Sequence, residues 1–252
     1  MLLSLIACGT SPTLTDGDAT GKARPPEEIY ADAMNEMDGH NYEKSAKLLE
    51  SLLSRYPYGR YAQQAQMELA YAYYKHSEPE AALTAADRFI KQYPTSPHVD
   101  YVYYLKGLIN FNADLSIFSS LIPRDLSEHD PQSVQDSFDA FKELVLRFPN
   151  SKYSPDARLR MQYLANTLAR HEINVARYYQ RRGAYVAAVN RAKTVLTDFS
   201  QTTQTTDALQ ILVQSYNALG MKQLRDDVQR VLDLNTRTGA KPAAPLPQDA
   251  KP

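Results

Sequence analysis

The sequence predicts an all-α fold in which about five helix pairs stack into a solenoid. An aromatic residue followed by proline occurs at Tyr56-Pro57, Tyr93-Pro94 and Phe148-Pro149, with a degenerate copy at Phe199-Ser200. Similar residues precede all four copies at the same distances. Between the chain ends no stretch shows the alternation of apolar and polar residues that is typical of a half-buried strand. Repeated helix pairs bury their apolar faces by stacking, and such arrays usually bind other proteins.

The agreement between the four copies extends over several columns before the second member of each phrase. The columns five, four, eight and twelve residues earlier hold, in turn, Leu52, Phe89, Leu144 and Val195; Leu53, Ile90, Val145 and Leu196; Leu49, Ala86, Phe141 and Ala192; and Ser45, Ala82, Ser137 and Ala188. Four unrelated stretches would rarely agree at so many positions. The copies therefore mark one repeated structural unit.

Proline marks several of the predicted helix starts. Ser96-Pro97, Asp130-Pro131 and Ser154-Pro155 each place a capping side chain before a proline at the first helical position, and Pro79 begins another helix. Together with the apolar runs, these signals predict helix pairs at 27–38 and 42–55, 60–76 and 79–92, 97–111 and 131–147, 155–182 and 184–198, and 205–219 and 221–234.

The second pair matches the tetratricopeptide pattern over residues 66–94. The matching positions are Leu69, Ala70 and Tyr73 on the first helix, and Ala82, Ala86, Phe89 and Pro94 on the second helix and its end. Small residues let the two helices approach closely, and Phe89 fills the space between neighbouring pairs. These residues are expected to form the core.

Two departures from a regular 34-residue period predict irregular features. Pro94 and Pro149 are 55 residues apart, which indicates a loop over residues 112–130 in the third pair. That loop is apolar enough either to fold back on the solenoid or to contact a partner. Pro149 and Ser200 are 51 residues apart because the first helix of the fourth pair is overlong, with no Gly or Pro from 156 to 182. Such a helix reaches about 40 Å, which is expected to be longer than its neighbours can cover.

Both chain ends are expected to lie outside the helical array. Cys8, the single cysteine, follows Leu5-Ile6-Ala7 and precedes Gly9, which resembles a bacterial lipobox. We expect residues 1–7 to be the end of a truncated signal whose start lies upstream, and a lipid to be attached to Cys8. Glycine rather than aspartate after the cysteine resembles the signal by which lipoproteins of this type are sorted to the outer membrane. Residues 8–26 are predicted to be a flexible tether, and residues 236–252 a disordered tail.

Several phrases resemble the BamD/ComL family of outer-membrane lipoproteins over residues 27–235. They are Arg55-Tyr56-Pro57-Tyr58-Gly59, Tyr71-Ala72-Tyr73-Tyr74-Lys75, Asp100-Tyr101-Val102-Tyr103-Tyr104-Leu105-Lys106-Gly107-Leu108, Asp130-Pro131-Gln132, Phe148-Pro149-Asn150-Ser151-Lys152-Tyr153 and Arg182-Gly183-Ala184-Tyr185-Val186-Ala187-Ala188-Val189-Asn190-Arg191. The resemblance implies a non-enzymatic scaffold, anchored by lipid on the periplasmic face of the outer membrane. It also implies three kinds of partner: the periplasmic domains of a barrel-forming assembly factor, other lipoproteins of the complex, and the aromatic-ended C-terminal segment of unfolded barrel proteins.

The family's layout predicts a substrate-binding half and a docking half. Residues 27–149 would form the substrate side, because first helices of tetratricopeptide pairs line a groove and are rich in tyrosine here. The proposed substrate-peptide groove consists of Arg60, Tyr71, Tyr74, Lys75, Tyr101, Tyr104 and Asn110. Tyrosine offers a stiff apolar face with one hydroxyl group. The same tyrosines could instead simply pack between helices.

Residues 150–235 would form the docking side, because positive charge concentrates there. The segment 156–193 carries a net charge of +6, whereas the whole chain carries −1 and the remainder therefore −7. The proposed docking residues for an acidic partner domain are Tyr178, Tyr179, Arg181, Arg182 and Arg191. A solvated helix face remains the alternative interpretation.

No pattern in the sequence favours catalysis, a metal or a cofactor other than the lipid. His171-Glu172 begins like a zinc-protease motif, but Val175 stands where the second histidine ligand would be. A different periplasmic tetratricopeptide lipoprotein, serving cell division or secretin assembly, stays open as an alternative. A cell-wall enzyme would need a carboxylate cleft that we do not find, and the nearly balanced charge argues against RNA binding.

Overall fold

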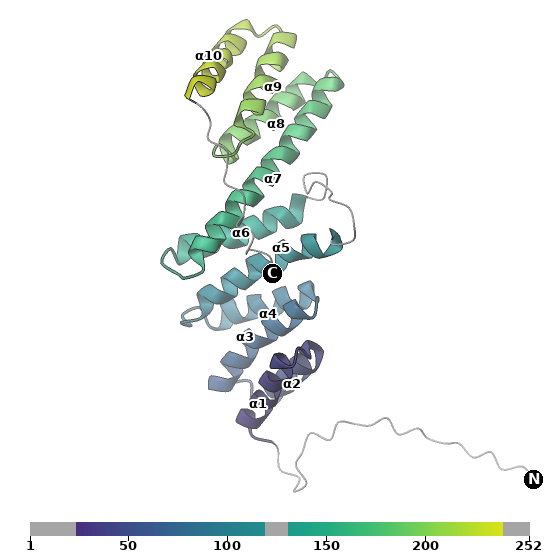
Figure 1. The fold of residues 1–252 in the computed structure, drawn as a ribbon, viewed down its shortest axis with the longest axis vertical. Coiled ribbons are helices and arrows are strands. Elements are labelled where there is room, and N and C mark those ends of the chain that lie inside the picture. The colour runs from purple at the N-terminus through teal and green to yellow at the C-terminus, as the bar shows by residue number, and fades with distance from the viewer. Residues whose placement is uncertain (1–23, 119–130, 239–252) are drawn as a thin grey trace, which may run out of the picture.

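A computed structural model describes residues 24–118 and 131–238, and within these ranges every regular element is an α-helix (Figure 1). The helices are α1 (Pro26–Asp38), α2 (Tyr42–Arg55), α3 (Arg60–Lys75), α4 (Pro79–Gln92), α5 (Val99–Phe118), α6 (Pro131–Arg147), α7 (Ser154–Arg181), α8 (Tyr185–Asp198), α9 (Thr205–Ala218) and α10 (Lys222–Thr238). The predicted all-α fold and its five helix pairs are confirmed.

The helix pairs form one elongated stack from α1 and α2 at one end to α9 and α10 at the other (Figure 1). Each described helix contacts the next one along the chain, and α3 also contacts the first helices of the pairs before and after it, α1 and α5. Contacts of both kinds are what a tetratricopeptide solenoid requires, because each pair buries its apolar faces against its neighbours.

The repeated aromatic phrase ends the second helix of each of the first four pairs. In every copy the aromatic backbone N–H donates to the carbonyl four residues earlier, over 2.8 Å at Tyr56, Tyr93 and Phe148 and 3.1 Å at Phe199. In the last three copies the N–H three residues later donates back to the aromatic carbonyl over 3.0 Å. Proline at the next position has no N–H and cannot continue the helix. Phe199 makes the same turn before a serine, so the proline is not essential to it.

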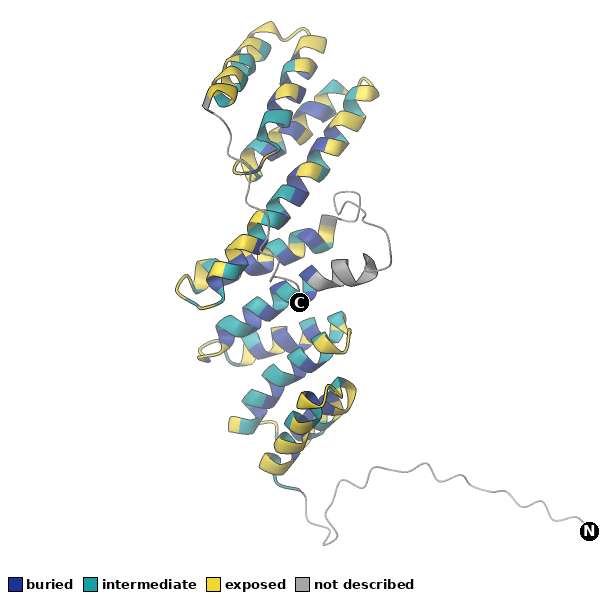
Figure 2. Cartoon of the chain, in the orientation of Figure 1, coloured by how far each residue is buried: buried dark blue, intermediate teal, exposed yellow. Residues whose placement is uncertain are grey.

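Buried residues run along the helices of the whole stack (Figure 2). The repeat columns belong to this core, which divides into two clusters. The residues five, eight and twelve before the phrase's second member are all at most 1% exposed, whereas those four before are half-buried. One cluster runs from α1 into the first half of α7, where it includes Leu164 and Leu168. The other joins the second half of α7, from Ala169 and Ile173 onward, to α8 and α9. Helix α7 therefore belongs to both clusters.

Small residues bring the two helices of a pair close together. Ser45 Oγ donates to the Ala33 carbonyl over 2.9 Å, and Ser137 Oγ donates to the Gly107 carbonyl over 3.1 Å. A Cβ added at Gly107 would lie 2.3 Å from Cε1 of the fully buried Phe141. The third pair thus accommodates a large ring on α6 by having no side chain opposite it on α5.

The structure corrects several of the predicted boundaries. Helix α5 begins at Val99 and not at Pro97, and it continues to Phe118, so residues 112–118 are helix instead of loop. The rest of the predicted loop, 119–130, lies outside the described residues, as does Asp130. Helix α10 extends to Thr238, so residues 236–238 belong to a helix instead of the predicted tail.

The capping roles predicted for two serines are wrong. Ser96 lies before the start of α5, where its Oγ accepts hydrogen bonds from Gln63 Nε2 over 2.8 Å and from the His98 N–H over 3.3 Å. Ser154 is the first residue of α7 and donates its hydroxyl back to the Phe148 carbonyl over 2.6 Å. Both side chains stabilise the turn that precedes the helix.

The long helix α7 is covered along its whole length, contrary to the expectation from its length. Helix α6 contacts it on one side of the stack and helices α8 and α9 on the other. Gln180, near its end, donates from Nε2 to Ser215 Oγ of α9 over 3.2 Å. The extra turns of α7 therefore carry the second core cluster.

Candidate functional site

The four predicted groove tyrosines lie together on the first helices of the second and third pairs. The Tyr71 and Tyr74 ring centroids are 6.4 Å apart on α3, and both side chains lie near Tyr101 of α5. Tyr153, just before α7, joins the group: its ring is 5.6 Å from Tyr101 and stacks on Tyr104 at 4.9 Å and 17°. We call Tyr71, Tyr74, Tyr101, Tyr104 and Tyr153 the tyrosine face.

Sequence reasoning missed Tyr153, although its place in the chain gave a signal. It stands five residues after Phe148, inside the turn that the repeat phrase predicts. This turn connects α6 to α7. It therefore lies beside α5, the helix that pairs with α6. Tyr30 and Tyr61, whose ring centroids are 5.6 Å apart, add aromatic surface near α1.

The tyrosine face is only half-exposed, and its hydroxyl groups have distinct environments. Burial is the largest cause that raises the pKa of Tyr101. Burial and the hydrogen bond that Tyr104 donates to Asp156 Oδ2 over 2.6 Å raise the pKa of Tyr104 to about 12. Asp156 also accepts from Arg160 Nε over 2.6 Å. Tyr104 is therefore held in one orientation, which suits a preformed binding surface as well as a packing role.

Glu68 brings a carboxyl group to the edge of this surface. It is half-buried on α3, and its charge acts on the hydroxyl groups of Tyr30, Tyr71 and Tyr101. Desolvation raises the pKa of Glu68. Within the described ranges Glu68 makes no hydrogen bond or ion pair. A half-buried, uncompensated carboxylate beside aromatic rings favours a cationic or hydrogen-bond-donating group in whatever binds there.

The structure does not bring the other three predicted groove residues together. Arg60 and Lys75 are the first and last residues of α3, so about 22 Å of helix separates them. Lys75 Nζ lies 5.9 Å above the Tyr42 ring. Asn110 lies on another side of α5, where it lines a cavity of about 300 Å³ together with residues of α4 and α6. The inclusion of Asn110 in the tyrosine groove is therefore corrected.

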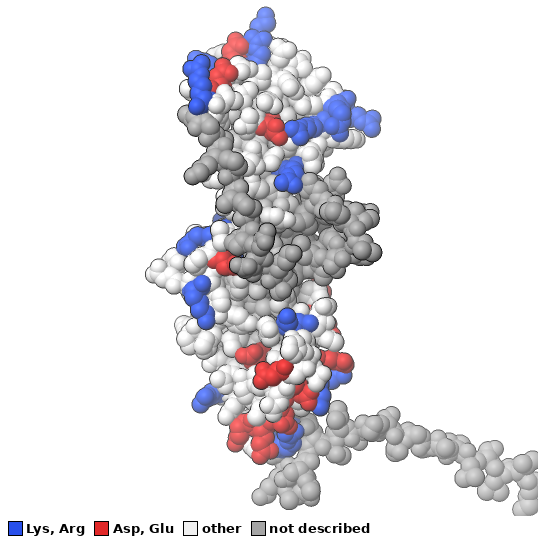
Figure 3. Space-filling model, viewed as in Figure 1, with Lys and Arg blue, Asp and Glu red and all other residues white. Residues whose placement is uncertain are grey.

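The predicted docking residues gather where α7 ends and α8 begins. The rings of Tyr178 and Tyr179 meet at 5.7 Å, and the Arg182 guanidinium lies 5.5 Å above the Tyr178 ring. Tyr178 and Arg181 line an open hollow of about 670 Å³ along α7. Lys and Arg gather at this end of α7, whereas Asp and Glu gather over the far end of the stack, around α1 and α2 (Figure 3). The charge segregation predicted from the sequence therefore appears on the face that Figure 3 shows.

Arg191 is bound within the chain instead of pointing freely to solvent. Its Nη1 donates to both carboxylate oxygens of Glu172 over 3.2 Å, linking α8 to α7. The Arg191 side chain remains 46% exposed, whereas that of Glu172 is 15% exposed. Glu172 therefore holds the guanidinium in place and leaves part of it accessible to a partner.

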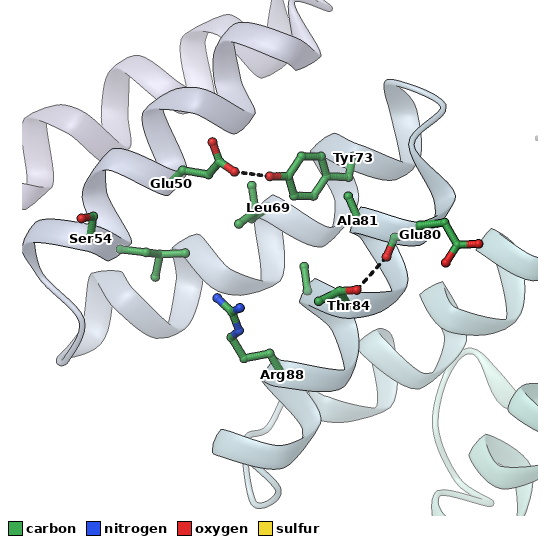
Figure 4. A pocket seen from close by; sticks show the side chains of 10 residues that line it. Glu50, Ser54, Leu69, Tyr73, Glu80, Ala81, Thr84 and Arg88 are labelled. Atoms are coloured by element: carbon green, nitrogen blue, oxygen red, sulfur yellow. Dashed lines mark hydrogen bonds between the residues drawn. The ribbon is translucent and has the colours of Figure 1, made fainter.

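A separate cavity of about 500 Å³ lies between α2, α3 and α4 (Figure 4). Its floor is apolar, with Leu53, Leu69 and Ala85. The Tyr73 hydroxyl donates to Glu50 at one side, and the Arg88 side chain reaches in from α4. Sequence reasoning assigned Tyr73 to the core and did not single out Arg88.

No group of three His, Cys, Asp or Glu side chains suited to a metal ion occurs among the residues with described positions. None of the helices placed by the structure has both the length and the apolarity needed to span a bilayer. Cys8 lies outside the described residues. What the described surfaces offer is aromatic area, fixed hydroxyl groups and accessible guanidinium groups, which suits protein binding.

Comparison with known proteins identifies the family. The family model described as "Outer membrane lipoprotein", YfiO, matches residues 22–231. The outer membrane protein assembly factor BamD of Neisseria meningitidis serogroup A is 43% identical over 92% of this chain and 87% of its own length. BamD of Xylella fastidiosa is 39% identical over 84% of this chain and 72% of its own length, and BamD of Vibrio cholerae is 32% identical over 92% and 93%.

Among solved structures, the MamA protein overlaps with 87% of the chain at a TM-score of 0.40 and 15% identity, which is too little similarity to carry an argument. The family match covers most of the chain, and the sequence identities extend over nearly the same length. The chain belongs to the YfiO family of outer membrane lipoproteins, together with the BamD assembly factors.

Proposed function

We propose that this chain is a non-enzymatic scaffold in the complex that assembles β-barrel proteins in the outer membrane. The main support for this proposal is that relatives 32–43% identical over most of the chain are named as outer membrane protein assembly factors. A stack of helix pairs with aromatic and basic surfaces suits such a role, because it offers separate binding surfaces along one rigid body. Its partners would be the barrel-forming factor, other lipoproteins of the complex and unfolded barrel proteins.

Depletion of the chain in cells tests this function. Folded, heat-modifiable barrel proteins should fall in the outer membrane, and the barrel-forming factor should copurify with the chain from detergent-solubilised membranes. Normal barrel assembly after depletion, or copurification only with division or secretin components, would contradict the proposal.

The tyrosine face is proposed to receive the aromatic-ended C-terminal segment of barrel substrates. Half-buried tyrosines lose little side-chain entropy on binding, and the hydrogen bond from Tyr104 to Asp156 fixes one ring in advance. Arg60 and Lys75 would contact only longer segments, since they lie at opposite ends of α3.

Replacing Tyr74 with Ala should weaken binding of an aromatic-ended barrel peptide about tenfold, which corresponds to about 1.4 kcal/mol. Fluorescence anisotropy with a labelled peptide measures the loss. Tyr58→Ala is the matched control, since Tyr58 is 88% exposed and lies outside the tyrosine face. Equal affinities for the Tyr74 variant and the wild type would remove Tyr74 from the binding surface.

The basic end of α7, with Tyr178, Tyr179, Arg181, Arg182 and Arg191, is proposed to dock an acidic surface of the barrel-forming factor. Arg191→Glu should abolish copurification with that factor. Arg147→Glu is a matched control, because Arg147 also pairs with a glutamate but lies on α6. In a further variant, Arg191→Glu with Glu172→Arg, the ion pair is kept with its charges exchanged. Docking by that variant would mean that Arg191 acts only by holding α8 to α7.

Cys8 is proposed to carry the lipid that anchors the chain on the periplasmic face of the outer membrane. Firm anchoring needs more than one acyl chain, since each buried methylene contributes only about 0.8 kcal/mol. Metabolic labelling with a fatty acid should tag the wild type and not Cys8→Ser, and the variant should leave the membrane fraction. Membrane retention of unlabelled Cys8→Ser would contradict a lipid anchor at this residue.

A further inference from the structure

The cavity between α2, α3 and α4 has the size and floor of a side-chain pocket. Its volume of about 500 Å³ lies within the usual range of ligand pockets. Its apolar floor consists of Leu53, Leu69 and Ala85, and the last two are each 6% exposed. This space is large enough for a bulky apolar side chain.

One charged group in the cavity has no partner of its own. Among the residues that the structure describes, Arg88 forms no hydrogen bond and no ion pair, and Figure 4 shows its side chain reaching in beside the apolar floor. Glu50 and Thr84 already make hydrogen bonds, and Glu80 is turned away. Glu50 accepts from the Tyr73 hydroxyl, Thr84 Oγ1 donates to the Glu80 carbonyl over 2.8 Å, and the Glu80 carboxylate points away from the cavity (Figure 4).

The equivalent groove one repeat further along the chain has the opposite character. It is the cavity of about 300 Å³ between α4 and α6. Glu143 lies there in the place of Arg88, one residue before the same repeat column, and Lys106 lies in the place of Leu69. Lys106 is already paired with Asp87 over 2.7 Å. The apolar floor with an unpaired guanidinium is therefore not shared by the equivalent groove of the next repeat.

We propose that this cavity docks a linear segment of a partner protein in which a bulky apolar side chain is followed by an aspartate or glutamate. The apolar side chain would occupy the floor, and the carboxylate would accept the paired N–H groups of Arg88 in the bidentate geometry that guanidinium favours. The cavity faces solvent, so a free small molecule would bury too little of its surface, whereas a peptide gains further contacts along α2 and α4. This site is distinct from the tyrosine face and from the basic end of α7.

Binding of short synthetic peptides to the full chain tests the proposal. The probe is fluorescein-labelled Gly-Ser-Gly-Phe-Asp-Ser-Gly-Gly with an amidated C-terminus, followed by fluorescence anisotropy. It should bind at least tenfold more tightly than the same peptide with Lys in place of Asp, or with Ser in place of Phe. Arg88→Glu should reverse the preference to the lysine peptide, and Arg88→Gln should abolish the discrimination between the aspartate and lysine peptides. Glu143→Arg, in the equivalent groove, should change neither affinity.

Several outcomes would overturn the proposal. They are no binding of the probe, equal affinity for the three peptides, or a preference for the aspartate over the lysine peptide that survives both Arg88 variants. A further peptide ending in Phe with a free carboxylate separates a chain terminus from an internal acid. If only that peptide binds, the cavity receives C-terminal ends and the proposed internal segment is wrong. Because none of these readouts involves barrel assembly, failure here leaves the proposed scaffold function standing.

Discussion

Replacing Gly107 with Ala should destabilise the chain, although alanine is the better helix former. In an ordinary helix interior this change stabilises by about 0.5–1 kcal/mol. Here the new Cβ would lie 2.3 Å from Cε1, 2.5 Å from Cδ1 and 2.7 Å from Cζ of Phe141. The Phe141 ring is fully buried, so it can move away only by disturbing its own neighbours. Overpacking of this kind costs about 1–3 kcal/mol, so the clash outweighs the gain in helix propensity.

The expected net loss is about 1–2 kcal/mol, which for a chain of this size lowers the melting temperature by about 2–8 °C. Thermal unfolding followed by circular dichroism measures it. Gly39→Ala is the matched control, because its Cβ would approach no atom closer than 3.4 Å. The double variant Gly107→Ala with Phe141→Leu should lose less stability than the sum of the losses in the two single variants, because the smaller side chain relieves the clash. A stabilised Gly107→Ala, or strict additivity in the double variant, would refute the close-approach account.

Two further predictions concern the tyrosine face. Tyr104→Phe removes the hydrogen bond to Asp156 and should cost about 0.5–1.5 kcal/mol. In alkaline titrations followed by tyrosinate absorbance, the variant should lose one group that ionises near pH 12; an unchanged curve would contradict the assignment. Glu68→Gln should stabilise the chain at neutral pH, because burial raises the pKa of Glu68 in the folded state. The ionised carboxylate costs stability above its folded-state pKa, and that cost disappears as the pH falls below the pKa of the unfolded chain. Melting temperatures of the two proteins should therefore differ at pH 7.5 and converge near pH 4; a constant difference would show that desolvation is not the cause.

The repeat phrase made the fold predictable, because it fixes several constraints at once. The turn after each aromatic residue specifies where a helix ends. The buried columns before that residue specify the helix itself and the face that it turns inward. The boundary errors arose where the repeat gave no information. Residues 112–118 contain no glycine or proline to stop α5, yet the predicted loop assumed that all first helices have similar lengths. Ser96 and Ser154 looked like caps because serine precedes proline, whereas their hydroxyl groups bind within the preceding turn.

For the candidate surfaces, helix periodicity predicts only which residues of one helix lie on the same face. At about 100° per residue, Tyr101 and Tyr104 lie about 60° apart on α5, whereas Asn110 lies about 120° from Tyr104 on the other side. That geometry alone excludes Asn110 from the tyrosine face. Tyr153 and Arg88 were harder to find, because each gains its role from contacts between helices that are distant in sequence.

The sharing of α7 between the two core clusters makes the relative orientation of the chain's ends depend on helical phase. A single residue inserted in the middle of α7 would lengthen it by about 1.5 Å but would rotate everything beyond the insertion by about 100°. An insertion of seven residues would nearly restore the angle while moving the far end by about 10 Å. In this chain, the number of residues in one helix therefore sets the direction in which a second partner must approach the first.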